Sequence, residues 1–277
     1  MWIIYFLLAN LALAVFGIIF LTPKDFFKKI PLDIKKLVLM GLKQYKLLLM
    51  IIIAVSFHIF EVNFLDPIAT QFVGYDYANT LVNIEDGIVY WFSQHWTPGV
   101  LHFFVIIYIV IYPFSLWFAL LYYILDSQTK ALKSLAYALV ITYLIALPFY
   151  LFLPITNVYT FYGGESALET VLPTIEQFFY STTTCDNCLP SLHTAMAIFL
   201  AYTGSLTDNK RFKYFTYFIL VTVLISVIYL SIHWITDVIA GAIVALVTIF
   251  LIERYIHKKE INEPNRKKST EKDNYNR

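Results

Sequence analysis

The sequence predicts an all-α membrane protein, a polytopic transmembrane helical bundle with about seven spans. Of its 277 residues, 59% are hydrophobic, 18% are aromatic and only 14% are charged, whereas charged residues make up about 25% of a typical soluble domain. Apolar runs of about 20 residues recur along the chain, and this length crosses a hydrocarbon core about 30 Å thick. A soluble enzyme, a disordered chain and a nucleic-acid-binding protein are therefore disfavoured.

The predicted spans are bounded by charged or turn-forming residues. The first span has no basic leader and no small-residue cleavage site, so we expect a retained helix and not a signal peptide. The third and fourth are joined by the short polar turn at residues 126–128 and form a predicted hairpin. The seven spans are residues 2–21, 47–62, 100–125, 131–154, about 190–206, 212 to about 229 and about 232–252. We expect a transmembrane domain at residues 1–253 and a disordered cytoplasmic tail at residues 254–277.

Basic residues predict which side of the membrane each connection faces. Lys and Arg number 20 against 19 Asp and Glu, for a net charge of +1, and all 20 fall in residues 22–46, 130–133, 210–213 and 254–277. With seven spans these four segments share one side, which the positive-inside rule makes cytoplasmic. Residues 22–46 also contain a predicted short surface helix. The connections at residues 63–99 and 155–189 contain no Lys or Arg and are predicted to face outward.

Two segments on the predicted outer face carry the residues suited to chemistry. The first includes Pro190, Ser191 and His193; Pro190 suits a first helical turn, where free backbone N–H groups can bind an anion. The second contains His233 and Asp237, four residues apart, so that on a helix the carboxylate can orient the imidazole. Two imidazoles and a carboxylate suit phosphoryl transfer through a covalent intermediate.

These segments resemble the type 2 phosphatidic acid phosphatase superfamily. Residues 190–193, Pro-Ser-Leu-His, are similar to its second signature block, and residues 226–237 are similar to its third block in the spacing of His and Asp. The resemblance implies a six-helix phosphatase-like core, with an extra N-terminal helix here, and a catalytic transmembrane domain. It also implies that His233 is the nucleophile, Asp237 its orienting partner and His193 the general acid.

The departures from the superfamily pattern concern its cations. The first block, with its Lys and Arg, is absent; Leu153 stands at the Arg position of its likeliest remnant, and Val227 replaces the Arg of the third block. With Leu192 in place of Gly, these losses resemble the inositol phosphorylceramide and sphingomyelin synthase branch. Phosphate binding then falls to helix N–H groups, protonated imidazole and the side chains of Ser191, Asn187 and Tyr229. Such a site should favour a phosphodiester over a dianionic monoester.

Other polar residues have both functional and structural interpretations. His58 and Glu61 lie one helical turn apart and predict either a functional pair or a buried ion pair. His95 and His102 are expected at the membrane interface.

Cys185 and Cys188 form a Cys-x-x-Cys pair that allows three readings. The two thiols could hold zinc with His193 and either His233 or Asp237, they could form a disulfide, or they could pack as free thiols. We expect neither a metal nor a cofactor.

The sequence thus predicts a multi-pass protein of the cell membrane with its active site on the extracytoplasmic side. The expected activity is that of a lipid phosphatase or phosphotransferase, and the expected partners are a lipid substrate and the membrane, with no nucleic acid. The alternative is a lipid-binding or transport protein that keeps this fold without the chemistry.

Overall fold

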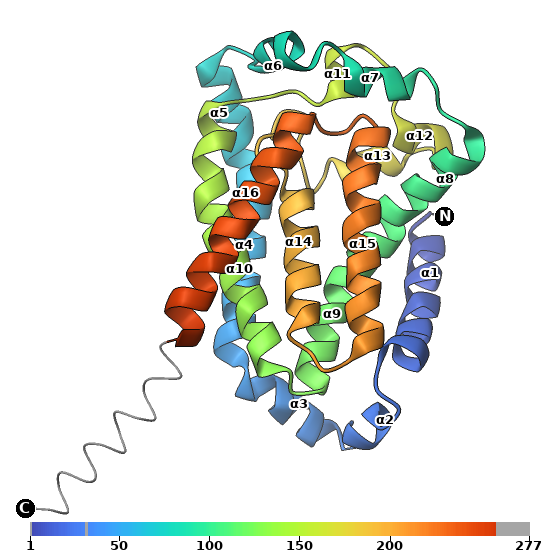
Figure 1. The fold of residues 1–277 in the computed structure, drawn as a ribbon, viewed down its shortest axis with the longest axis vertical. Helices are drawn as coiled ribbons and strands as arrows, with labels where there is room; N and C mark the ends of the chain where they lie inside the picture. The colour runs from blue at the N-terminus through green and yellow to red at the C-terminus, as the bar shows by residue number, and fades with distance from the viewer. Residues whose placement is uncertain (1, 31–32, 259–277) are drawn as a thin grey trace, which may run out of the picture.

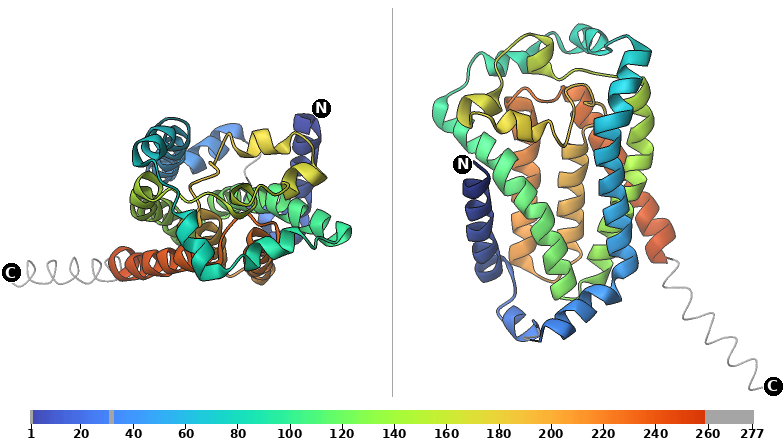
Figure 2. Two further views of the ribbon diagram at one scale, coloured as in Figure 1. Left: turned by 90° about the horizontal axis from the view of Figure 1, so that it is seen from above. Right: turned by 180° about the vertical axis from the view of Figure 1, so that it is seen from behind.

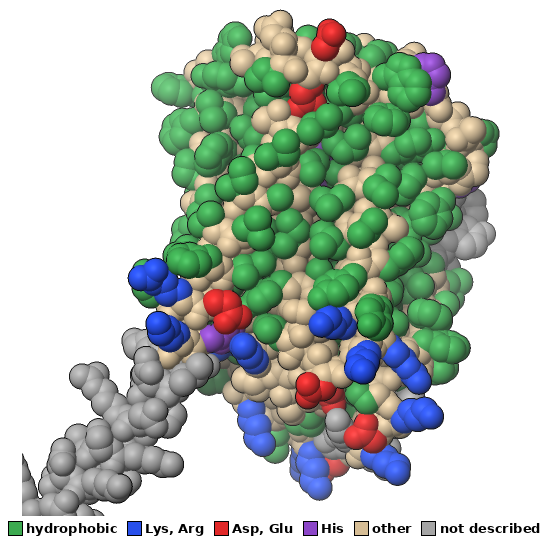
Figure 3. Space-filling view, in the orientation of Figure 1, with side chains coloured by type: hydrophobic (Ala, Val, Ile, Leu, Met, Phe, Trp, Pro, Cys, Tyr) green, Lys and Arg blue, Asp and Glu red, His purple; other side chains and the backbone are tan. Residues whose placement is uncertain are grey.

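The computed structural model describes residues 2–30 and 33–258, and all regular secondary structure among them is helical. Long helices run roughly along one direction as a bundle, and short helices cover its two ends (Figure 1). Large apolar side chains lie exposed along the outer faces of the bundle, among them Leu144, Ile243 and Phe250 (Figure 3). This outward apolar surface suits lipid, and the predicted all-α membrane helical bundle is confirmed.

Within residues 2–30 and 33–258, five continuous helices are long and apolar enough to cross a membrane. They are Tyr45–Val73, which contains α4 (Tyr45–Phe60) and α5 (Asp66–Val73); Pro98–Leu125, which contains α8 (Pro98–Ile106) and α9 (Tyr112–Leu125); α10 (Thr129–Phe152); α15 (Lys210–Tyr229); and Ile235–His257, which contains α16 (Ile235–Leu251). The other two predicted spans are shorter. One is the apolar segment Leu8–Leu21, which includes most of α1 (Trp2–Phe16), and the other is α14 (Leu192–Ser205).

The short helix α14 lies in the middle of the bundle (Figures 1 and 2). It packs against α15, α16 and α10. Gly204 near its end permits the close approach of α15, because a Cβ atom at this position would collide with the side chain of Thr216. The position of α14 carries His193, from the first of the two segments predicted to carry the chemistry, into the protein interior.

Several helix boundaries differ from the sequence-based prediction. The second span continues beyond residue 62 to Val73, because its polar side chains Glu61 and Asp66 point into the protein and are buried. The fifth begins at Leu192, with Ser191 as its N-cap. The seventh begins at Ile235 and continues to His257, past the predicted boundary at 253; residues 259–277 of the predicted tail lie outside the described part.

The two ends of the bundle differ in charge. Helices α2 (Phe26–Lys29) and α3 (Ile34–Lys43) lie at one end, where the described Lys and Arg side chains gather (Figures 1 and 3). The opposite end is covered by five short helices from the two connections that lack Lys and Arg. They are α6 (Ala78–Glu85), α7 (Ile88–Ser93), α11 (Val158–Phe161), α12 (Ala167–Val171) and α13 (Ile175–Phe179). The predicted grouping of the basic residues on one side is thus present in the fold.

Candidate active site

The three residues predicted to carry the chemistry lie together near the end of the bundle opposite the basic residues. Nδ1 of His193 is 3.2 Å from Nε2 of His233. Nδ1 of His233 is in turn 3.3 Å from Oδ2 of Asp237. His233 and Asp237 are buried, and His193 is partly buried. The structure therefore places two imidazoles and one carboxylate in a single row.

The row is assembled where the start of α14 meets the first turns of α16. The backbone N–H of Ser191 donates a 3.0 Å hydrogen bond to the carbonyl oxygen of Asp237. This contact requires Gly241, because a Cβ atom there would collide with the Ser191 carbonyl oxygen. The Ser191 hydroxyl caps α14 by accepting the N–H of Thr194, and such capping stabilises a helix start.

The contact between His233 and Asp237 differs from the predicted pairing on one helical face. His233 lies two residues before Ile235, the first residue of α16. The carboxylate of Asp237, in the first turn, accepts the backbone N–H of Trp234 at 2.9 Å and so turns back toward the preceding residue. The capping arrangement that begins the helix is thus what orients the imidazole.

The environment of His233 favours a neutral ring. Burial lowers its pKa to about 3, and a hydrogen bond to the carbonyl of Cys188 opposes this shift. At neutral pH the ring therefore has one protonated and one unprotonated nitrogen. Because Nδ1 faces the Asp237 carboxylate, a proton on Nδ1 leaves the lone pair on Nε2, the nitrogen that would attack phosphorus.

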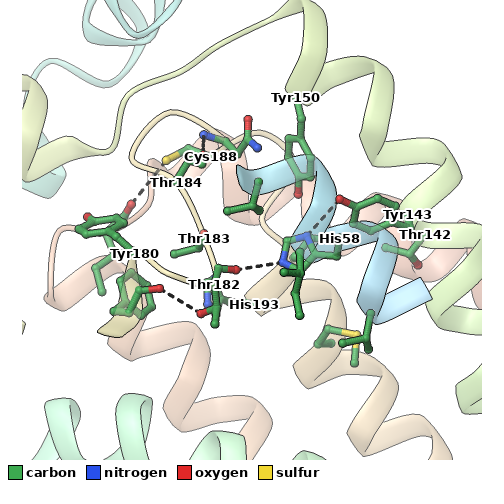
Figure 4. Close-up of a pocket in the computed structure, with 18 of the residues that line it drawn as sticks. His58, Thr142, Tyr143, Tyr150, Tyr180, Thr182, Thr183, Thr184, Cys188 and His193 are labelled. Atoms are coloured by element: carbon green, nitrogen blue, oxygen red, sulfur yellow. Dashed lines mark hydrogen bonds between the residues drawn. The ribbon is translucent and has the colours of Figure 1, made fainter. Parts of the chain in front are cut away.

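A cavity of about 330 Å³ runs beside the row of imidazoles, and both His193 and His233 line it. One of its walls is apolar, with Val55 and Ile59 of α4, which are exposed on the outer face of the bundle, and Leu139 of α10. Its other wall carries hydroxyl groups from Thr182, Thr183 and Thr184, next to Tyr180 (Figure 4). Such a cavity can hold an apolar chain at one end and a polar group beside the imidazoles at the other.

The residues predicted to bind substrate are separated by the fold. Asn187 lines the cavity. Its Nδ2 donates to Glu61, and its Oδ1 is buried with no hydrogen-bond partner among the described residues. Ser191 is fully buried in its capping role. Tyr229 closes α15 and accepts the backbone N–H of Thr97 through its hydroxyl. Of the three, Asn187 is the one the structure places at the cavity.

The three other histidines considered in the sequence analysis, His58, His95 and His102, fall into two groups. His58 lines the same cavity, and its two ring nitrogens contact the Tyr143 hydroxyl at 3.0 Å and the Thr182 carbonyl at 3.1 Å. Its Nδ1 is also 3.8 Å from the carboxylate of Glu61. His95 and His102 are exposed, and each contacts a backbone carbonyl one helical turn earlier.

The two cysteines are free thiols in this structure. Burial raises the pKa of Cys185 and of Cys188, so both are protonated at neutral pH. Ligand atoms of Cys188, His233 and Asp237 lie within 4.8 Å of one another. This group differs from the zinc ligands considered from the sequence, because it contains neither Cys185 nor His193, and any metal held there would occupy the candidate nucleophile.

Several residues at the site were not identified from the sequence. The Tyr108 hydroxyl lies 2.9 Å from Nε2 of His193, and the Tyr143 hydroxyl donates to Glu61 at 2.7 Å. Both tyrosines come from strongly apolar helices rich in aromatic residues, so no local pattern distinguished them. Among the described residues that line the cavity, none is Lys or Arg, as expected from the missing cations.

Comparison with known proteins identifies a family for this chain. No curated protein and no solved structure matches the chain. A family model described as the PAP2 superfamily matches residues 78–251. This range is more than half of the chain, and it includes His193, His233 and Asp237. Helices α1 to α5, with His58 and Glu61, precede the matched segment. The chain therefore belongs to the PAP2 superfamily, and this membership supports a function of the phosphatase or phosphotransferase type.

Proposed function

We propose that the protein is an integral membrane lipid phosphatase or phosphotransferase that acts through a phosphohistidine intermediate on phospholipid or polyprenyl-phosphate substrates. Nε2 of His233 attacks phosphorus while Asp237 holds the opposite ring nitrogen. His193 protonates the leaving oxygen, and water or a second lipid then takes the phosphoryl group from His233.

One observation carries this proposal: the two imidazoles lie side by side, with ring nitrogens 3.2 Å apart, in the wall of a cavity that also has an apolar wall. A lipid can place an acyl or prenyl chain against α4 and α10 and its phosphorus beside His233. A water-soluble phosphate ester would leave this apolar wall uncovered, which disfavours such a substrate.

The polar groups at the cavity suit a weakly charged phosphoryl group. The first residues of α14, Leu192 and His193, line the cavity, where the helix N-terminus favours an anion. Because Lys and Arg are lacking among the described lining residues, a monoanionic phosphodiester is the preferred substrate over a dianionic monoester. This preference supports head-group transfer, as in the inositol phosphorylceramide and sphingomyelin synthase branch.

The charge distribution supports an extracytoplasmic site in the cell membrane. The described Lys and Arg side chains gather at the end of the bundle away from His233 (Figure 3). Basic connections stay in the cytoplasm as a rule, so the imidazoles face the outer leaflet.

The experiment is a product analysis with purified protein in mixed micelles. Phosphatidic acid, phosphatidylcholine, phosphatidylethanolamine and phosphatidylinositol, each labelled in turn, are incubated with the protein, and the products and any acid-labile phosphoprotein are resolved. We expect a cleaved or exchanged head group with the wild type and with His95→Ala, and none with His233→Ala. Full activity of a folded His233→Ala protein would exclude the assigned nucleophile.

A second candidate function, lipid binding or transport without chemistry, is favoured by the lack of cations along the described cavity wall. It predicts that wild-type protein retains bound lipid, never releases phosphate or exchanges a head group, and forms no phosphohistidine. The same product analysis separates the two functions.

A further inference from the structure

Tyr108 contacts His193 from the side opposite His233. It lies in the helical turn Ile107–Ile111 between α8 and α9, and 2% of its surface is exposed. Its hydroxyl is 2.9 Å from Nε2 of His193, while Nδ1 of the same ring faces His233 at 3.2 Å. Each nitrogen of His193 therefore has a different partner, one a tyrosine hydroxyl and the other the candidate nucleophile.

The hydrogen bonds along this row have one consistent direction when both rings are neutral and the carboxyl group of Asp237 is ionised. The Asp237 carboxylate only accepts, so the His233 proton lies on Nδ1 and its Nε2 carries a lone pair. Nδ1 of His193 must then be the donor to that lone pair. Its own Nε2 is left unprotonated and accepts the hydroxyl proton of Tyr108. The row thus runs from Tyr108 through His193 and His233 to Asp237.

The remaining neighbours of His193 do not distinguish its nitrogen atoms from its carbon atoms. The ring of Phe179 is stacked on it with centroids 6.2 Å apart, and the ring of Tyr112 lies 6.0 Å away. Rotating the imidazole by about 180° about Cβ–Cγ would exchange Nδ1 with a carbon atom and remove the donor from His233. These aromatic walls confine the plane of the ring, while the Tyr108 hydroxyl selects which edge faces the nucleophile.

We propose that Tyr108 is a positioning residue for proton transfer. It holds Nε2 of His193 so that Nδ1 can donate a proton to the leaving oxygen and later accept one from the incoming water or alcohol. This inference rests on the proposed function. Because a hydroxyl can both donate and accept, Tyr108 serves His193 in either protonation state.

The proton balance assigns each nitrogen one role. Binding of the anionic phosphoryl group between the two rings favours a doubly protonated His193. As the bond from His233 Nε2 to phosphorus forms and the bond to the leaving oxygen breaks, the Nδ1 proton of His193 moves to that oxygen. The remaining proton, on Nε2, is donated to the Tyr108 oxygen. In the second step Nδ1 takes the proton of the incoming water or alcohol as the nitrogen–phosphorus bond breaks.

The first test compares two leaving groups in Tyr108→Phe. One substrate is whichever labelled phospholipid the wild type turns over, with an alcohol leaving group, and the other is the p-nitrophenyl ester of the same phosphoryl group, whose leaving group needs no proton. We expect kcat for the phospholipid to fall by about 10- to 100-fold. This loss is a fraction of the rate enhancement from general acid–base catalysis, which is about 10²- to 10⁴-fold. KM should stay within about twofold, and the initial burst of p-nitrophenolate should be retained.

Tyr123→Phe is the matched control. Like Tyr108, Tyr123 lies buried in the continuous helix Pro98–Leu125. Its hydroxyl donates to Thr203 at 2.9 Å, away from the cavity. This variant loses the same atom and should keep wild-type kcat for both substrates. Unchanged kcat in Tyr108→Phe, or an equal loss for both leaving groups, would overturn the proposal.

The second test needs no turnover. Spectra of protein labelled with ¹⁵N-histidine at neutral pH should show His193 with a proton on Nδ1 and none on Nε2, with the signal assigned by its loss in His193→Gln. In Tyr108→Phe the two tautomers should mix. A wild type that processes none of the lipids would count against the proposed function alone, whereas an unchanged His193 tautomer in Tyr108→Phe would count against the role of Tyr108.

Discussion

Two histidine–carboxylate pairs line or adjoin the same cavity, and they are built differently. His233 and Asp237 are 3.3 Å apart and meet at the capped start of α16, with His233 just before the helix and Asp237 in its first turn. His58 and Glu61 are 3.8 Å apart and lie within the continuous helix Tyr45–Val73. From the sequence, the spacings of four and three residues look equally suited to pairing.

The difference between the pairs lies in the partner of the second ring nitrogen. Nε2 of His233 faces His193, another imidazole that lines the cavity, so an incoming phosphoryl group can replace this contact. Nε2 of His58 contacts the Thr182 carbonyl, and its Nδ1 contacts Tyr143. His58 therefore links the loop that contains Thr182, Thr183 and Thr184 to α4. A histidine beside a carboxylate is suited to catalysis only when its other nitrogen can reach the substrate.

The largest expected effect separates the two carboxylates. Asp237→Asn keeps the shape of the side chain but removes the charge that orients Nδ1 of His233, and we expect kcat to fall by about 10³- to 10⁴-fold, as for the orienting aspartate of a catalytic triad. Glu61→Gln should cost less than about tenfold. Initial rates with the phospholipid substrate measure both, and equal losses would remove the distinction between the pairs.

His193→Gln tests the general acid. The variant keeps a polar side chain but cannot carry the proton at neutral pH, so we expect a loss in kcat of about 10²- to 10³-fold. Phosphohistidine formation from a p-nitrophenyl ester should survive, because that leaving group needs no proton. Failure to form the intermediate from this ester, in a folded protein, would assign His193 a different role.

His58→Gln should mainly affect stability. The substitution breaks the contacts to Tyr143 and the Thr182 carbonyl, and leaving such groups unpaired costs about 1–3 kcal/mol. We expect a lower Tm in detergent and a fall in kcat of less than about tenfold. A loss in kcat as large as that of His193→Gln, without a change in Tm, would make His58 part of the chemistry.

The pKa of His233 predicts how stability changes with pH. The unfolded chain protonates this imidazole near pH 6.5, whereas the folded protein resists protonation down to about pH 3. The unfolded state thus binds more protons between these values, so the free energy of unfolding falls as the pH falls through this window. Tm measured from pH 7 to pH 4 should decrease more in the wild type than in His233→Asn, and parallel curves would contradict this.

The smallest effect is expected from metal removal. A chelator should leave the rate unchanged, because the proposed reaction uses only imidazole and carboxylate groups. Added zinc should inhibit by binding Cys188, His233 and Asp237, whose ligand atoms lie within 4.8 Å, and Cys188→Ser should weaken that inhibition. Activity that is lost with a chelator and restored by zinc would instead indicate a metal-dependent site.

The fold and the central residues of the site could be predicted because both depend on local sequence. Apolar length predicts helices, and the predicted spans 100–125 and 212–229 end at the observed Leu125 and Tyr229. The boundary after residue 62 was wrong, since Glu61 and Asp66 look like the end of a span until the buried contacts of Glu61 to Tyr143 and Asn187 are known. Hydropathy does not distinguish a carboxylate that faces water from one that faces a hydrogen-bond donor inside the protein.

The sequence by itself determined that the protein is a helical membrane bundle, that its basic residues lie at one end, and which two histidines and aspartate belong together. The first two properties follow from composition and from the spacing of apolar and basic residues. The third follows from two short motifs that resemble signature blocks of the superfamily. Only the tertiary structure decided that His233 and Asp237 meet at a helix cap and that Tyr108 contacts His193. It also decided that Ser191 and Tyr229 form hydrogen bonds away from the cavity. Contacts of this kind join segments tens of residues apart, so they depend on how the helices pack and not on any pattern within one of them.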